Sequence, residues 1–567
     1  MIERQHMTRT SAGFGLVLLT LFIALIGMPL SQLFIDLLPV DGGGLDALRQ
    51  LLLQSSLPQS SLRTLAVALL AWGLASVLAV PLAMIAVRAN VTLRVLVPLL
   101  GLLPLVMPPF VTAAVLLHFA DVPQLAGRDF WPDEWPMSGR LATLILVYAL
   151  HFFPVILFSL IVGLERVDRI LYESARNLGA GRFTAWRRVA LPLALPPFVL
   201  GAGLVSLRIV EDVATPLMLD IDDLLAPQFV LRLAAAGPGD PLLTLAALVM
   251  LTLSALIVAF AWSALTPLPV RRAEAACPQP LRWRHPTRAA LLATPLIGIL
   301  AVLGLAPLLG LGWMSLADHW SGGPLPDPVG PFDYQALLAD GLPILRATLA
   351  YAVIAGILLL VAGGALGWLS TTPGVLGRFT RAAVNGLFAI PGLVLAFACL
   401  QTASHIDWAQ AAWPNLAWLA LAAVVAVKHL PFAGYLIARQ GRMLGRGSQE
   451  SARTLGVAGP ALYLRVVLPA LVGTLVAVFL IGFAAAAWEL TAVLVLLDGS
   501  SSPPPLTLGI FQTLQTPGGD RTYSHEVTNT GSQNDSFEIT FASQLGWILE
   551  LLNPDTGAVL AADADGD

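Results

Sequence analysis

The chain has 567 residues, of which 57% are hydrophobic and only 12% are charged, and its formal net charge is −4. A soluble domain carries about 25% charged residues, so this composition excludes a water-soluble globular protein and makes the lipid bilayer the solvent. The basic residues are arginines except for Lys428, a pattern that gives no indication of nucleic-acid binding. The two cysteines, Cys277 and Cys399, have no partner spacing, so we expect no disulfide framework, no metal site and no cofactor.

Eleven apolar runs are long enough for a membrane-spanning helix, which needs roughly 20 residues. In chain order, the predicted spans cover residues 13–35, 62–87, 94–119, 141–164, 193–218 and 242–265, followed by 289–314, 345–370, 382–403, 414–438 and 469–497. We interpret the first run as a retained span, because no small-residue cleavage site follows it. The predicted fold class is an all-α polytopic membrane protein with two tandem helical bundles of about six and five spans.

The placement of arginines predicts the orientation in the membrane. Arginines cluster in alternate loops, at residues 88–94, 166–188, 271–288, 378–381 and 439–465. Most of the loops on the other side are acidic. Because cytoplasmic loops carry the excess of basic residues, we expect a multi-pass protein of the bacterial inner membrane with a cytoplasmic N-terminus.

One polar segment occurs twice in the chain. The sequence Glu173-Ser-Ala-Arg-Asn-Leu-Gly179 returns in the second half as Glu450-Ser-Ala-Arg-Thr-Leu-Gly456, and a Leu-Pro pair follows both copies at the same distance. This spacing indicates a tandem duplication, with two halves of parallel topology related by an axis along the membrane normal. The charged residues and one apolar face predict a short helix that ends at the glycine and docks on a partner.

The duplication also predicts the domain boundaries. We expect a first repeat at 1–270, a cytoplasmic linker at 271–288, a second repeat at 289–520 and a polar tail at 521–567. The second repeat lacks a counterpart of span 242–265, because the sequence after Asp520 becomes polar and acidic. Alternating residues such as those at 537–541 indicate strands and turns. The tail is interpreted as a fragment of an extracytoplasmic β-sandwich repeat, as a frameshift or assembly artefact, or as a disordered end without function.

The repeated pattern, Glu-x-Ala followed after three residues by Gly and later by Leu-Pro, resembles the cytoplasmic "EAA" loop of ABC importer permeases. Serine stands at the middle position in both copies, which is a mild departure from the family pattern. The resemblance covers about residues 60–515, both halves, and this part of the chain is similar to the fused, MetI-like permeases of the ferric iron, thiamine and polyamine importers.

This resemblance implies a specific set of partners and roles. The residues implied to bear the coupling helix, which sits in a cleft of the ATPase subunit, are Glu173, Ala175 and Gly179 with Glu450, Ala452 and Gly456. Two such segments imply two ATPase subunits per permease, and the family implies an extracytoplasmic substrate-binding protein. The chain has no ATPase of its own, because a P-loop needs Gly-Lys-Ser/Thr and Lys428 lies between Val427 and His429. We therefore expect it not to be an enzyme.

Acidic residues inside the predicted spans are candidates for the translocation path. An acid within a span costs about 2.5–3.5 kcal/mol on insertion scales, and Glu211, Asp212 and Glu489 fall in such positions. Glu211 and Glu489 are near-equivalents in the two repeats. Either the acids line the path, or Arg208 pairs with them and locks helices together. His151 and His429 have no second ligand at metal-site spacing and are interpreted as structural.

The predicted function is transport of a small substrate, driven by a separate ATPase. Ferric iron is the first expectation, because the segment 487–496 resembles the Glu-Leu-x-Ala-Thr-Leu type of segment in iron permeases; thiamine, polyamines and organophosphonates remain open. A gradient-driven secondary transporter with parallel repeats is one alternative. A membrane scaffold that does not transport is another, since the twelfth helix is missing.

Overall fold

The structure is a computed structural model and describes most of residues 55–515 together with a hairpin near the C-terminus. The residues it describes outside this range are 20, 23, 26–35, 52, 549–552 and 559–563. The gaps within it are 89–90, 121–136, 168, 265–285, 317–329, 331, 373, 445–450, 453, 458–459 and 498–502. The chain divides into two compact units, Met1–Phe511 and Gln512–Asp567, and each is described by itself.

The first half of the larger unit is a series of helices and tight turns. In order, these are α3 (Leu57–Arg88), α4 (Val91–Gly101), the 3-10 turn η1 (Leu103–Val106), α5 (Pro109–Ala120), α7 (Met137–Glu165), α8 (Arg169–Asn177), α9 (Arg182–Ala185), the π-helical turn η2 (Trp186–Ala190), α10 (Leu191–Glu211), α11 (Ala214–Met218), α12 (Leu225–Ala236) and α13 (Pro241–Ser263).

The second half repeats this order closely. It contains α14 (Pro286–Met314), α15 (Phe332–Leu369), α16 (Val375–Gly386), the 3-10 turn η3 (Leu387–Ala389), α17 (Gly392–Ser404), α18 (Asp407–Met443), α20 (Pro460–Leu462), the π-helical turn η4 (Tyr463–Val467), α21 (Leu468–Ala487), α22 (Thr491–Leu496) and α23 (Leu506–Gln515). The two π-helical turns occupy equivalent positions in the repeat, since each leads directly into α10 or α21.

Ten of the eleven predicted spans are present among the described residues. Eight helices are long and apolar enough to cross a membrane, and two bent helix pairs bring the number to ten. The remaining prediction, 13–35, lies mostly outside the described residues, of which residues 26–35 form a short apolar helix. The all-α polytopic fold class is therefore confirmed for the larger unit.

The predicted spans at 94–119 and 382–403 are present but broken. The helices there are bent by 79° between residues 106 and 109 and by 95° between residues 389 and 392. At each break a residue before proline is extended: Met107 has φ −111° and ψ 141°, and Ile390 has φ −100° and ψ 108°. Proline disfavours the helical conformation of the residue that precedes it, so Pro108 and Pro391 end the first helix of each pair.

The predicted spans 193–218 and 469–497 are also interrupted. Helix α10 ends at Glu211 and helix α21 ends at Ala487, and short helices α11 and α22 follow after two or three residues. Each break places an acidic residue, Asp212 or Glu489, at the start of the short helix. The interruptions therefore lie at the candidate site and not at random in the bundle.

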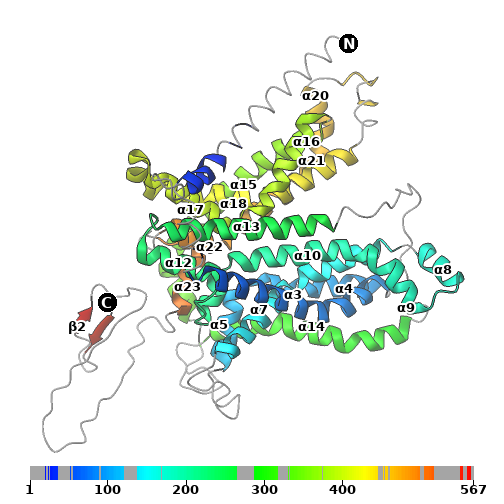
Figure 1. Cartoon of the computed structure of the whole chain (residues 1–567), viewed down its shortest axis with the longest axis horizontal. Coiled ribbons are helices and arrows are strands. Elements are labelled where there is room, and N and C mark those ends of the chain that lie inside the picture. The colour runs from blue at the N-terminus through cyan, green and yellow to red at the C-terminus, as the bar shows by residue number, and fades with distance from the viewer. Residues whose placement is uncertain are drawn as a thin grey trace, which may run out of the picture. The chain divides into compact units, whose positions relative to one another are not determined.

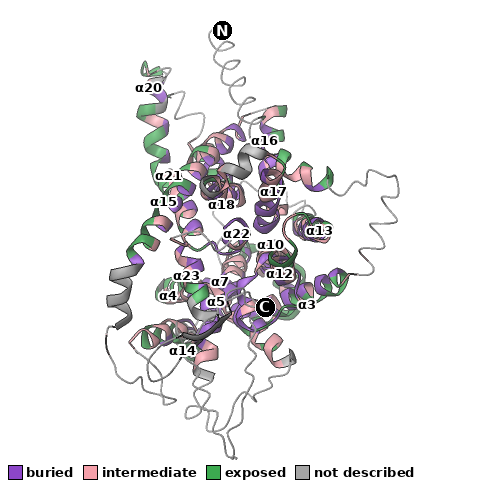
Figure 2. Ribbon diagram, turned by 90° about the vertical axis from the view of Figure 1, so that its left-hand side faces the viewer, coloured by how far each residue is buried: buried purple, intermediate pink, exposed green. Residues whose placement is uncertain are grey.

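The two halves meet in two places: α14 of the second half packs against α3, α4, η1 and α5 of the first, and other contacts lie at one end of the larger unit. Helix α12 contacts α22, and α13 contacts α17 and η3, so both contacts join the first half to the second. Figure 1 shows the helices of the two halves diverging from this region toward α8 in one half and α20 in the other. Buried residues concentrate on α17, α22 and the facing side of α18, whereas α21 and much of α15 are exposed (Figure 2).

Helices α15 and α18 approach closely because glycines face the contact. A Cβ added at Gly363 would lie 2.6 Å from Cβ of Ala433, and one at Gly367 would lie 2.8 Å from Cβ of Ile437 and 3.1 Å from the backbone of Gly434. Small residues four apart let the backbones of membrane helices pack together. The spacing of Gly363 and Gly367 therefore fixes how closely these two spans pack.

We expect Gly367→Leu to destabilise the chain by about 1–3 kcal/mol, because overpacking a close helix contact forces the backbones apart. Thermal denaturation of the purified protein in detergent measures this loss. Gly364→Leu is the matched control, since nothing lies within 4 Å of a Cβ at that glycine. Equal melting temperatures for the two variants would contradict the proposed packing role.

The smaller unit contains a two-stranded antiparallel sheet among its described residues. Strand β1 (Leu549–Leu552) pairs with β2 (Val559–Asp563), and Leu549 lies opposite Asp563. The alternating segment 537–541 lies outside the described residues, and so does the region where a counterpart of α13 is predicted to be missing.

Candidate functional site

The first copy of the repeated segment is a short helix with a glycine cap. Helix α8 ends with the backbone N–H of Ala180 donating to the carbonyl of Ala175 at 3.1 Å and the N–H of Gly179 donating to Arg176 at 3.0 Å. Gly179 has φ +89°. This bond pair with a left-handed glycine is the Schellman motif. It explains the spacing, because Ala175 supplies the acceptor and Gly179 the turn. Within the helix, Glu173 pairs with Arg169 at 2.7 Å.

The second copy has the same cap where the structure describes it. The N–H of Val457 donates to the carbonyl of Ala452 at 2.9 Å, and Gly456 has φ +81°. Glu450 lies outside the described residues. Both copies therefore end in one geometry at equivalent positions of the repeat.

Two leucines at the caps are the most exposed large apolar residues of these segments. Leu178 is 88% exposed and Leu455 is 83% exposed, and they occupy equivalent positions. Ile170 and Phe183 add further exposed apolar surface to the first copy. Clusters of exposed apolar residues mark sites of interaction with a protein or with a membrane. From the sequence, an apolar face was predicted for the repeated segment, but this pair of leucines was not singled out. The signal for the pair is the Leu-Gly that both copies share.

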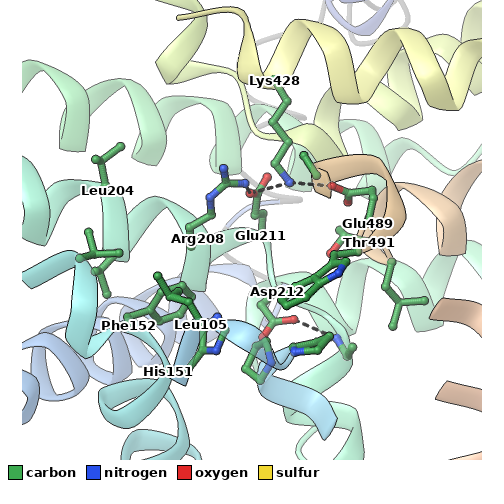
Figure 3. Close-up of a pocket in the computed structure, with 18 of the residues that line it drawn as sticks. Leu105, His151, Phe152, Leu204, Arg208, Glu211, Asp212, Lys428, Glu489 and Thr491 are labelled. Atoms are coloured by element: carbon green, nitrogen blue, oxygen red, sulfur yellow. Dashed lines mark hydrogen bonds and ion pairs between the residues drawn. The ribbon is translucent and has the colours of Figure 1, made fainter. Parts of the chain in front are cut away.

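A cavity of about 550 Å³ lies between the two halves. Its walls come from the break between η1 and α5, from α7, from α10 and α11, and from α18 and the break between α21 and α22. The three predicted acidic residues Glu211, Asp212 and Glu489 all line it, and the structure brings them together from both halves. Figure 3 shows them with the basic residues Arg208 and Lys428 around the cavity.

Lys428 joins the two glutamates. Its Nζ lies 2.9 Å from Oε1 of Glu211 and 3.1 Å from Oε2 of Glu489. Arg208 Nη1 also lies 2.9 Å from Oε1 of Glu211. Both glutamates are buried, with exposed fractions of 6% and 7%. The sequence-based pairing of Arg208 with Glu211 is present, but the second cation was missed because Lys428 was weighed only as a P-loop lysine.

Asp212 and Glu489 have the same local role. Asp212 accepts from the N–H of Ala214 at 3.2 Å and from the hydroxyl of Thr215 at 2.5 Å. Glu489 accepts from the N–H of Ala492 at 3.1 Å. Each acid thus satisfies free N–H groups at the start of a short helix. In the register that pairs Gly179 with Gly456, the positional counterpart of Glu489 is therefore Asp212, next to Glu211.

The histidines expected to be structural make hydrogen bonds to the fold. His429 has Nδ1 at 2.9 Å from the carbonyl of Val425 and Nε2 at 3.3 Å from Nη2 of Arg208. Because arginine only donates, Nε2 accepts and Nδ1 carries the proton. His151 bonds the carbonyl of Pro104 at 3.1 Å. Among the residues that the structure describes, no group of three His, Cys, Asp or Glu could hold a metal ion.

The fold is that of an all-α polytopic membrane protein, with a cavity between two helical bundles. A sequence profile of the family described as "Binding-protein-dependent transport system inner membrane component" matches residues 75–268. These residues form a domain of that family.

Several curated proteins are similar to part of the chain. The molybdenum transport system permease protein ModB of Escherichia coli K12 is 35% identical over 109 residues, which is 19% of this chain and 47% of the relative. ModB of Mycobacterium tuberculosis is 37% identical over 133 residues, covering 23% and 50%. A probable molybdenum ABC transporter permease of Haloferax volcanii is 31% identical over 140 residues, covering 25% and 51%. The chain spans about half the length of these relatives. No solved structure matches it significantly.

Proposed function

We propose that this chain is the membrane-spanning subunit of a bacterial ABC importer in the inner membrane. Its N-terminus is cytoplasmic, and two ATPase subunits dock on the segments around Gly179 and Gly456. The observation that carries this proposal is the pair of capped helices at equivalent positions, each presenting an exposed leucine at its cap. A binding protein on the other side delivers the substrate. The second half is then a diverged copy of the domain that the family profile matches in the first.

The docking segments are connected to the cavity by a continuous series of helical elements. Behind α8, the chain passes through α9 and η2 directly into α10, whose last turn carries Arg208 and Glu211. Helix α10 has 21 residues, and Pro196 and Pro197 lie within it at sites where a helix can bend. When ATP closes the two ATPase subunits, the docked segments approach each other, and α10 and α21 rearrange the walls of the cavity.

The similar proteins change the expected substrate. Each of these relatives is named for molybdenum, whereas the sequence-based expectation was ferric iron. We propose a small oxyanion as the first candidate on this ground alone. The cavity favours neither choice, because its cations Arg208 and Lys428 already pair with acids.

Reconstitution tests both levels of the proposal. The complex is purified from its native cell through a tag on this chain and placed in proteoliposomes, and ATP hydrolysis is measured with its binding protein and molybdate, with ferric iron, or with no ligand. We expect hydrolysis and uptake to rise with molybdate. A rise with ferric iron would restore the iron assignment. Purification of the chain without any ATPase would refute the importer and favour the scaffold.

A further inference from the structure

We propose that Lys428 is the centre of a one-sided ionic latch across the cavity, and that this latch holds the permease in its resting state. The inference rests on the importer function proposed above and adds the element that suppresses ATP hydrolysis before a loaded binding protein arrives.

The latch ties one half of the chain to the other. Lys428 lies on α18 of the second half, and its Nζ contacts Glu211 of the first half and Glu489 of the second (Figure 3). A buried ion pair strongly resists the removal of one partner, because the remaining charge is left unpaired. Moving α10 away from α18 would likewise separate Glu211 from Lys428. Both charges would then need new partners.

Backbone groups hold both carboxylates in place. Glu211 Oε2 accepts from the N–H of Gly392 at 2.8 Å, at the start of α17, and Glu489 accepts from the N–H of Ala492. A Cβ at Gly392 would lie 2.9 Å from Cδ of Lys428 and 3.3 Å from Oε2 of Glu211. The glycine therefore lets the lysine and the glutamate reach each other beside the helix end. Backbone hydrogen bonds and a glycine without a side chain therefore fix the geometry of the cluster.

The latch exists on one side of the cavity only. In the register that pairs Gly179 with Gly456, the counterparts of Lys428, Glu211 and Arg208 are His151, Trp488 and Ala485. The two helix breaks pair Pro108 with Pro391, so the counterpart of Gly392 is Pro109.

None of these counterparts can rebuild the cluster. All four line the same cavity, but they carry no carboxylate, and Pro109 has no N–H to offer one. The counterpart of Glu489 is Asp212, whose carboxylate accepts from the N–H of Ala214 and the hydroxyl of Thr215. The two halves thus differ at the place where their pseudo-symmetry would put a second latch. No equivalent cluster among these residues replaces the first one if it is lost.

The position of the latch gives the direction of its effect. Glu211 is the last residue of α10, on the side where α12 meets α22 and α13 meets α17. The halves diverge from there toward α8 and α20 (Figure 1). We therefore expect the halves to part near the latch when the docking segments come together, while α14 stays packed on the first half. An interaction made in only one of two states shifts their populations toward that state. The latch favours the state with separated docking segments.

The test is ATP hydrolysis by the complete complex in proteoliposomes without binding protein. We expect Lys428→Met and Glu489→Gln to raise this basal rate by about fivefold or more, the lower end of typical coupling effects, and to reduce stimulation by loaded binding protein. Lys428→Arg keeps the charge and should stay near wild type. Arg232→Met is the matched control, because Arg232 pairs with Asp240 at 2.5 Å within one half.

The possible outcomes distinguish failure of the latch from failure of the importer function. If wild type responds to loaded binding protein while Lys428→Met and Glu489→Gln keep the wild-type basal rate, the latch is wrong and the cluster only stabilises the fold. The same conclusion follows if the variants melt at lower temperature without faster hydrolysis. If wild type itself does not respond to its binding protein, the importer function is rejected, and the latch falls with it.

Discussion

Replacing Gly179 and Gly456 together with valine is expected to abolish ATP-driven transport. Both glycines have positive φ, +89° and +81°. An L-residue in this region is destabilised by roughly 1–2 kcal/mol, and a β-branched residue is tolerated least. The cap would open, so that Leu178 and Leu455 leave the positions at which we propose that the ATPase docks. Uptake by proteoliposomes and ATPase recovered with the tagged chain measure the loss.

Gly237→Val is the control for this double variant. Gly237 has φ +75° and ends α12, so the substitution also strains a positive-φ position, but away from the docking segments. We expect ATPase recovery to remain at the wild-type level for Gly237→Val. Equal recovery for the double variant would mean that the caps do not position the docking surface.

Removing Lys428 alone is expected to destabilise the protein more than removing the whole charged cluster. Lys428→Met leaves the buried carboxylates of Glu211 and Glu489 without their shared cation, and breaking a buried pair in this way costs about 3–5 kcal/mol. The triple variant Lys428→Met, Glu211→Gln, Glu489→Gln leaves no unpaired buried acid there. Arg208 keeps its contact with His429. We therefore expect the triple variant to recover much of the lost stability.

Thermal denaturation of the purified chain in detergent compares these variants directly. The two glutamate substitutions, made together with Lys428 intact, complete the cycle and show whether the charges interact. Additive losses across the three positions would contradict the shared-cation geometry. Because this measurement needs no ATPase, it tests the cluster separately from the importer function.

Hydropathy predicted the spans well because membrane helices need long apolar runs, and ten of the eleven are described as such. The breaks were missed because Pro108 and Pro391 lie within apolar runs. The length and hydropathy of such a run do not show that the helix is interrupted. Their signal was present, since each follows a residue that proline pushes out of the helix. Glycine at the end of the repeated segment predicted a turn, and the cap at Gly179 confirms one.

The charged cluster could not be derived from sequence spacing. Lys428 is 61 residues from Glu489, and its other partner belongs to the other half of the chain. A lysine inside the predicted span 414–438 is itself a functional signal, and weighing it only against a nucleotide motif overlooked that. Which acid it meets depends on how the two bundles pack, because α18 and α10 face one cavity only in the folded chain.

The most direct test of the central claim is the number of ATPase subunits bound to one copy of this chain, measured by native mass spectrometry of the complex released from its membrane. The two capped segments predict two ATPase subunits per chain. Leu178→Glu alone should lower that number to one, and Leu178→Glu with Leu455→Glu should leave none. A wild-type chain that carries no ATPase would contradict the claim that these segments are docking sites.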